Sequence, residues 1–182
     1  MNGIEMEGML EYLFVTTGIG LSGAGAIMAV GLACVGSARG ISTGASQAAG
    51  ILSEKPELFG KLFILTSLPG TQGFYGLVMA FFIALRTGMM APEENIVGPM
   101  VGVAMLFVGL FMGLAEWKSA AFQGETCAAC INWTSKRPED SGRAIILPVL
   151  VETYGVVALI IGVVLTLFLT GESFMIAGIP LP

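Results

Sequence analysis

Four long apolar stretches dominate the chain, and the segments between them hold most of its charged residues. The stretches run from Tyr12 to Ala38, from Leu62 to Leu85, from Asn95 to Ala115 and from Ala144 to Thr170. About 20 apolar residues are enough for a helix to cross the roughly 30 Å hydrocarbon core of a bilayer. Since only helices and closed barrels satisfy their own backbone polar groups in lipid, the pattern predicts an all-α membrane protein with four transmembrane helices.

The composition agrees with this fold class and excludes others. Hydrophobic residues make up 55% of the chain and charged residues only 12%, whereas soluble domains are about 45–50% apolar and about 25% charged. The apolar composition predicts membrane lipid as the surrounding, and with a formal net charge of −5 nucleic acid is not expected as a partner. Glu5, Glu7 and Glu11 stand where a secretory signal has its basic region, which predicts that the first stretch stays in the mature protein.

The basic residues predict the orientation of the helices. Seven of the eight fall between the first and second stretches or between the third and fourth: Arg39, Lys55, Lys61, Lys118, Lys136, Arg137 and Arg143. Arg86 alone falls on the other side. By the positive-inside rule, two long polar loops are cytoplasmic, and both termini and the Glu93-Glu94 turn lie outside.

An internal duplication divides the chain into two helical hairpins. Residues 68–76, with the sequence LPGTQGFYG, match residues 147–155, with the sequence LPVLVETYG, at a shift of 79 positions. Repeats of this kind are common in membrane proteins. They predict hairpins at residues 12–90 and 91–170, preceded by an outward-facing N-terminal segment, 1–11, and followed by a C-terminal tail, 171–182.

Small residues are concentrated in the first helix of each hairpin, where they allow helix backbones to approach closely. The clearest series are Gly36, Gly40 and Gly44 in the first hairpin and Gly98, Gly102, Gly109 and Gly113 in the second. The pattern fits ordinary packing in a monomeric bundle, or a crowded inner circle of helices in a ring. A ring is favoured because the glycine-rich helix comes first in both hairpins.

Glu152 is the most informative residue, since an ionisable side chain inside a span is costly and marks a site for an ion, a proton or a partner charge. Counted from the outer ends of the helices, Glu152 lies 20 residues before Glu172, and Glu116 lies 22 residues after Glu94. A rise of 1.5 Å per residue places the two carboxyl groups at similar depth. Glu116 is then either part of one site with Glu152 or a solvated residue at the membrane surface beside Lys118.

The second helix adds three oxygen-bearing side chains, those of Thr71, Gln72 and Tyr75, and Pro69 frees a backbone carbonyl about one turn earlier. Ordinary interhelical hydrogen bonds would satisfy these groups. Together with a carboxylate, they also form a set of hard oxygen ligands suited to sodium or to a proton.

Only the second hairpin carries acids at the two central positions. At the shift of 79, Glu152 corresponds to Gly73 and Glu116 to Ser37. The sequence therefore predicts one ion site per four helices, assembled from the second, third and fourth spans.

These residues resemble a known family. LPGTQGFYG at 68–76, GLAEWKSAA at 113–121 and LPVLVETYG at 147–155 are similar to the duplicated proteolipid K (c-type) subunit of prokaryotic V-type (V/A-type) ATPases. The resemblance covers nearly the whole four-helix region. It implies a ring of identical subunits in the prokaryotic plasma (inner) membrane, acting as the rotor of a rotary ATPase.

The resemblance also implies a set of site residues. In the sodium-pumping members, the ion is held by the Leu68 backbone carbonyl, Thr71, Gln72 and Glu152, and the Tyr75 hydroxyl bonds to the Glu152 carboxylate. The third helix of the family normally supplies a glutamine where this chain has Glu116, and Glu116 is therefore expected as a further ligand.

Because this chain has Glu116 where the family has glutamine, the bound ion could be either Na+ or H+. Two facing carboxylates do not both ionise in a low-dielectric site, so one is expected to hold a proton while the pair titrates as a unit. Either Glu116 is protonated and donates a hydrogen bond while Na+ is bound at Glu152, or the two acids share a proton and the ring carries H+. The presence of Thr71 and Gln72 favours Na+ as the bound ion.

The implied mechanism is rotary and needs partner subunits. Glu152 would exchange its cation opposite an arginine of a stator membrane subunit, and then pass through lipid with the site neutral, because an empty anionic site facing lipid is costly. The loops at Lys55-Pro56 and Lys136-Arg137-Pro138 are placed to touch a central-stalk subunit. The chain has no GxxxxGK[ST] motif, so it is expected to be a non-catalytic subunit and the ATP chemistry to belong to its partners.

Two other functions are compatible with a buried glutamate. One is a small cation-coupled secondary transporter that works as a monomer or dimer, and the other is a structural or pore-forming proteolipid in which Glu152 is only hydrogen-bonded. Neither explains why one hairpin has an acid where the other has glycine.

The cysteines do not predict a metal site. Cys127 and Cys130 form a C-x-x-C pair, but Cys34 is the only other cysteine and the chain has no histidine. A zinc site with four protein ligands is therefore not expected.

Overall fold

The computed structural model describes residues 3–90 and 97–171. In the first hairpin, α1 (Gly3–Leu52) is followed by an arm made of four consecutive elements: η1 (Pro56–Leu58), α2 (Phe59–Ser67), η2 (Leu68–Gly70) and α3 (Thr71–Arg86). The second hairpin has α4 (Pro99–Lys136), followed by η3 (Pro138–Asp140), α5 (Ser141–Ala144) and α6 (Ile146–Leu169). The Glu93-Glu94 turn and the tail from residue 172 onward lie outside the described residues.

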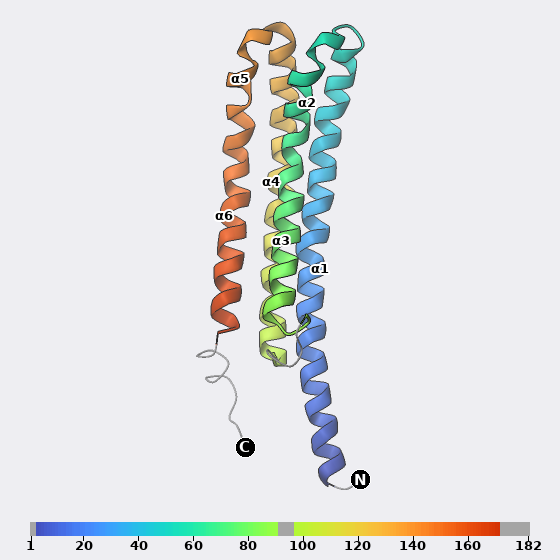
Figure 1. Ribbon diagram of the computed structural model, residues 1–182, viewed down its shortest axis with the longest axis vertical. Coiled ribbons are helices and arrows are strands. Elements are labelled where there is room, and N and C mark those ends of the chain that lie inside the picture. The colour runs from blue at the N-terminus through green and yellow to red at the C-terminus, as the bar shows by residue number, and fades with distance from the viewer. Residues whose placement is uncertain (1–2, 91–96, 172–182) are drawn as a thin grey trace.

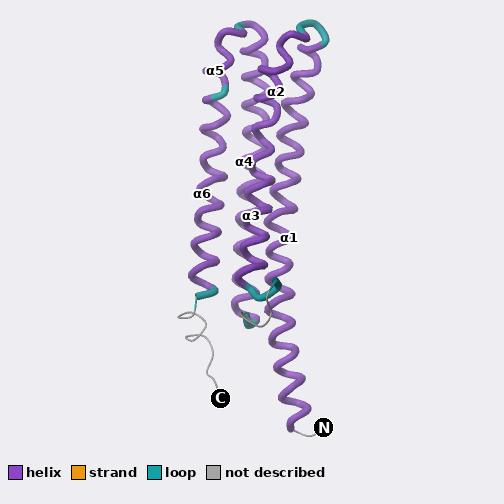
Figure 2. The backbone as a smooth tube through the Cα atoms, viewed as in Figure 1, coloured by secondary structure: helices purple, strands orange, loops and turns teal. Residues whose placement is uncertain are grey.

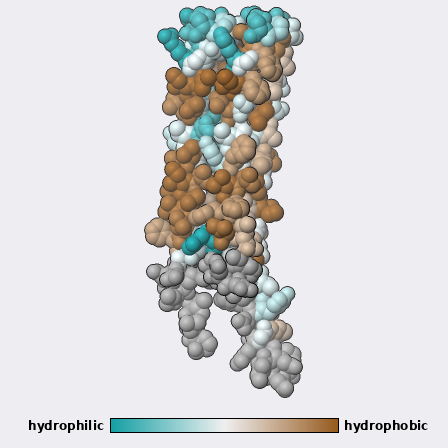
Figure 3. Space-filling view, in the orientation of Figure 1, coloured by the Kyte–Doolittle hydropathy of each residue, from teal (hydrophilic) through white to brown (hydrophobic). Residues whose placement is uncertain are grey.

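The four arms lie side by side in one elongated bundle (Figures 1 and 2). Each is long and apolar enough to cross a membrane: Thr16–Leu52, Pro56–Arg86, Pro99–Lys136 and Pro138–Leu169. The prediction of an all-α protein with four membrane-spanning helices is therefore confirmed. Hydrophilic residues cover the end that carries the two hairpin connections, and most of the surface below is hydrophobic (Figure 3).

The predicted long polar loops are wrong. Arg39 lies inside α1, which continues to Leu52, and Lys118 lies inside α4, which continues to Lys136. Charged side chains predict where a segment meets polar surroundings, but a helix keeps its backbone hydrogen bonds there as well as in lipid. The connections are short as a result, and the N-terminal part of α1 extends beyond the other helices at the opposite end (Figure 1).

Glycines bring the backbones of α1 and α4 into direct contact. A Cβ atom on Gly109 would overlap the Gly25 carbonyl oxygen, and one on Gly102 would lie 2.5 Å from the Gly18 carbonyl oxygen. At the other end of the pair, Gly124 lies directly against Gly40. The glycine-rich helices predicted to pack closely therefore do so against each other.

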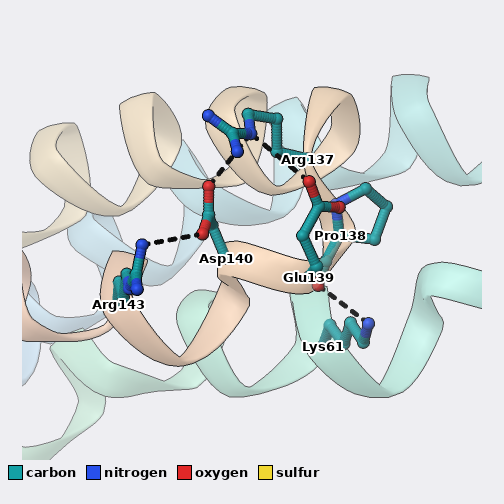
Figure 4. Close-up of polar contacts among 6 residues, drawn as sticks. All are labelled: Lys61, Arg137, Pro138, Glu139, Asp140 and Arg143. Atoms are coloured by element: carbon teal, nitrogen blue, oxygen red, sulfur yellow. Dashed lines mark hydrogen bonds and ion pairs between the residues drawn. The ribbon is translucent and has the colours of Figure 1, made fainter.

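Polar contacts join the two hairpins where their connections lie (Figure 4). The Lys61 ammonium group donates a hydrogen bond to the Pro138 carbonyl at 2.8 Å, and Lys55 donates one to the Ser135 carbonyl at 2.8 Å. The Arg137 guanidinium lies 3.0 Å from the Asp140 carboxylate and helps to order the turn into α5. The two lysine contacts therefore join the hairpins at this end.

Candidate functional site

Glu152 is a half-buried carboxylate surrounded by neutral donors. It lies in the first half of α6, where its Oε1 accepts a hydrogen bond of 2.7 Å from the Tyr75 hydroxyl. Its Oε2 accepts one of 3.2 Å from the Gln123 amide. Among the described residues, the ion pairs within 4.0 Å all involve other carboxylates. The charge of Glu152 is therefore solvated by dipoles and has no protein counter-ion in this part of the chain.

Two buried glutamines connect the three helices around Glu152. The Gln123 amide group from α4 also donates to the Pro148 carbonyl at 3.1 Å. Its carbonyl oxygen accepts a hydrogen bond of 2.8 Å from Gln72 of α3, and Gln72 donates a second one, of 3.2 Å, to the Ser119 hydroxyl. Since both glutamines are fully buried, the network fixes the position of the carboxylate relative to α3 and α4.

A break in the second arm places three oxygen atoms together. Because Pro69 has no N–H, α2 ends at Ser67 and the chain passes through the tight turn η2 before α3 begins. The Thr71 hydroxyl lies 3.1 Å from the Leu68 carbonyl oxygen and 3.2 Å from Gln72 Oε1. These carbonyl, hydroxyl and amide oxygens are the kind of ligand that hard cations prefer.

Glu116 is fully buried and neither of its carboxyl oxygens has a hydrogen-bond partner among the described residues. It lies against α6, since a Cβ atom added to Gly155, one turn after Glu152, would be 2.7 Å from Glu116 Oε2. The alternative prediction, that Glu116 is a solvated residue at the membrane surface beside Lys118, is therefore wrong, although Lys118 itself is exposed. An ionised carboxylate buried without a partner is strongly disfavoured, so this group needs a proton or a cation.

Sequence reasoning missed three residues of the site: Gln123, Ser119 and Gly155. The first two lie seven and three residues after Glu116, which is the spacing of a single helix face. This spacing was the available signal, but the prediction ended the third span at Ala115 and so treated both residues as part of a loop. Gly155 has a separate role, because its missing side chain makes room for the Glu116 carboxyl group.

Comparisons with known proteins agree with the duplication. The profile of the ATP synthase C-subunit family matches the chain twice, at residues 24–83 and 106–165. The V-type sodium ATPase subunit K of Enterococcus hirae is 36% identical over 164 residues, which cover 87% of this chain and 99% of that protein. The A-type ATP synthase subunit K of Methanocaldococcus jannaschii is 32% identical over 145 residues, which cover 80% of this chain and 61% of that protein.

Proposed function

The chain belongs to the ATP synthase C-subunit family, and we propose that it is the K subunit of a V-type ATPase rotor ring that carries Na+ on Glu152. A ring of identical subunits, each with one ion site, would turn in the membrane and couple ion movement to ATP hydrolysis or synthesis in partner subunits. The name of the Enterococcus hirae relative, a sodium ATPase subunit, supports the choice of ion.

The observation that carries this proposal is the neutral surrounding of the Glu152 carboxylate. Tyr75 and Gln123 donate to its two oxygens, and no ion pair within the described residues neutralises it. A carboxylate at this depth in an apolar helix becomes stable when a cation or a proton neutralises it. A site that carries an ion requires this arrangement, because its carboxylate must be neutralised by an exchangeable cation and not by a fixed basic side chain.

The same physics supports a rotary cycle. A neutral, occupied site passes through lipid at low cost, whereas an empty one is stable only beside a positive charge. We propose that an arginine of a stator membrane subunit supplies that charge while Glu152 releases one ion and takes up the next. Each elementary charge that crosses the membrane potential contributes about 2.3 kcal/mol per 100 mV, so several ions must be coupled to one ATP.

The ligands proposed for Na+ are the oxygens of Glu152, Glu116, Gln72, Thr71 and Leu68. The Thr71 hydroxyl and the Gln72 carbonyl oxygen lie close together beside Leu68 and would turn toward the ion, while Tyr75 keeps its bond to Glu152. Glu116 would be protonated and donate a hydrogen bond within the site. The second candidate function, an H+ ring in which the two acids share the proton, is favoured by the complete burial of Glu116.

We also propose the orientation of the subunit in a prokaryotic plasma membrane. The connections around Lys55, Lys61 and Arg137 lie at one end of the bundle, and Arg86 lies at the other. The positive-inside rule places the connections in the cytoplasm, where they would contact a central stalk, and both termini outside.

Carbodiimide labelling of detergent-solubilised rings tests the ion directly, because this reagent modifies a protonated buried carboxyl group. We expect Na+ to protect Glu152 from labelling. Raising the pH should lower the Na+ concentration needed for protection, because fewer protons compete for the carboxylate. Labelling at Glu152 and at Glu116 is measured separately by mass spectrometry of peptides.

Labelling that depends on pH but is unaffected by Na+ would show that the ring carries protons. The variant Glu116→Gln separates the two roles of the second acid. Sodium protection persists in this variant if Glu116 acts only as a neutral hydrogen-bond donor, since glutamine also donates. If the acids share a proton, the pH dependence of Glu152 labelling shifts in the variant.

Gln123→Leu should weaken sodium protection by about tenfold or more. Leucine cannot donate to Glu152 or accept from Gln72, and hydrogen bonds to charged groups contribute about 1.5–3 kcal/mol each. Protection of Glu152 is titrated with Na+ at fixed pH. The matched control is Gln47→Leu, which removes an exposed interhelical bond from Gln47 to Asn132 and should leave the titration unchanged. Equal protection in both variants would mean that Gln123 has no part in the site.

A further inference from the structure

The helix α6 has an exposed apolar face on the side away from Glu152. Only 17% of the most apolar window of its arm is buried within the chain, the lowest share among the four arms. Tyr154 is 76% exposed and lies about 200° around the helix from Glu152. Ile161 and Leu165 lie on the same face as Tyr154 and are also exposed.

This face borders a groove between α4 and α6. The groove has a volume of about 350 Å³, and Phe107 and Phe111 of α4 form its other wall together with Ile161 and Leu165 of α6. All four side chains are exposed. The face of the second hairpin that is not packed against the first is therefore apolar and hollowed.

The first hairpin has a groove of similar size, about 360 Å³, between α1 and α3. Its lining includes Cys34 and Ser37 of α1 and Gly73, Phe74 and Leu77 of α3. On α3, Phe74 and Leu77 lie roughly 120–180° around the helix from Met79 and Ile83, which are fully buried in the bundle. Each hairpin thus has an apolar groove of about this size on a face that is not packed against the other hairpin.

The duplication indicates what covers these faces. Within the chain, Tyr75 of the first hairpin reaches the Glu152 carboxylate of the second. In the repeated motif, Tyr75 corresponds to Tyr154 and Glu152 to Gly73. We infer that, in the proposed ring, Tyr154 of one subunit inserts at Gly73 and Ser37 in the α1/α3 groove of the next subunit, so that the interface between subunits is an ion-free counterpart of the ion site.

The space for that tyrosine is the groove itself, which is open at Gly73 because this residue has no side chain. Gly73 has no side chain, and its N–H donates a hydrogen bond of 2.8 Å to the Ser37 hydroxyl oxygen. A Cβ atom at Gly73 would lie 3.3 Å from Ser37 Oγ and 3.8 Å from Cys34 Sγ, so these two groups line the place where Glu152 has its carboxylate in the other hairpin. The Tyr154 hydroxyl would then find the Ser37 hydroxyl as its polar partner.

The inference rests on the proposed ring and assigns different roles to its two kinds of interface. The interface inside each chain binds the cation, and the interface between chains is closed by an aromatic side chain. Gly73 and Ser37 supply no carboxylate where the second hairpin has Glu152 and Glu116, and the tyrosine closes the groove, so no charge remains there to bind a cation.

Photocrosslinking tests this contact in the assembled ring. The photoreactive amino acid p-benzoylphenylalanine is incorporated in place of Tyr154, and the purified ring is irradiated. We expect covalent dimers whose adducts map by mass spectrometry to Cys34, Phe74 or Leu77 of the neighbouring subunit. The matched control replaces Ile160, which is 53% exposed and points about 120° away from Tyr154, and should give few protein adducts.

The outcomes separate this inference from the proposed function. One outcome is that particles of ring mass form while position 154 gives either no crosslinked dimer or only adducts outside the α1/α3 groove. In that case the inferred contact of Tyr154 is wrong and the proposed ring is unaffected. If no particle of ring mass forms with the unmodified chain, both fail. A second measurement compares ring dissociation on heating: Tyr154→Ala should dissociate at a clearly lower temperature than Tyr154→Phe, which keeps the aromatic ring. Equal dissociation temperatures would contradict the insertion.

Discussion

Glu152→Gln is expected to abolish sodium transport by the assembled complex. The amide cannot supply the negative charge that binds the cation, while Tyr75 and Gln123 still provide hydrogen-bonding partners for a side chain of the same shape. Removing one partner of a buried charge pair costs about 3–5 kcal/mol, which corresponds to a loss of about 100-fold or more in occupancy. Uptake of radioactive Na+ into proteoliposomes containing the complex measures the effect.

The matched control for this prediction is Glu125→Gln. Glu125 lies on α4 two residues after Gln123, but its side chain is exposed and belongs to no part of the hydrogen-bond network around Glu152. It should transport normally, and both variants should form particles of ring mass. Sodium uptake by Glu152→Gln at a rate close to the unmodified complex would remove the basis of the proposed function, because no other carboxylate interrupts α6.

Gly25→Ala is expected to prevent stable folding of the four-helix unit. A methyl group at this position would overlap the Met105 carbonyl oxygen of α4 and crowd the backbone of Leu106, and neither atom belongs to a flexible side chain. The helices would have to separate along the contact that also includes Gly109. Changes of this kind belong to the rare substitutions that cost more than about 4 kcal/mol. The yield of folded subunit and its midpoint of thermal unfolding in detergent measure the effect.

Gly20→Ala is the control in the same helix. Among the described residues, a Cβ atom there would have no neighbour within 4 Å, and alanine is the better helix former by about 0.5–1 kcal/mol. We expect this variant to fold as well as the unmodified chain. If the two alanine variants unfold at the same temperature, the close contact of α1 and α4 is not what holds the unit together.

The number of helices, the duplication and the position of a carboxylate within the fourth span follow from the sequence alone. These features depend on local properties: the length of apolar runs, the cost of an ionisable group in lipid and the repeated LP…YG motif. The same local information failed where helices leave the apolar region. Arg39 and Lys118 suggested loops, whereas α1 and α4 continue past them, because a change in polarity does not break a helix.

The residues that meet around Glu152 follow only from the way the helices pack. Gln123 and Ser119 are distant from Glu152 in sequence, and they reach the site because α4 continues past Ala115 and packs against α3 and α6. The burial of Glu116 was likewise open from the sequence, since an acid at the end of an apolar stretch is stable in water as well as in a site. Composition predicts that a segment enters lipid. Which side chains face one another depends instead on the rotation and axial position of each helix. These are set by contacts between helices, such as the backbone contact of Gly25 with α4.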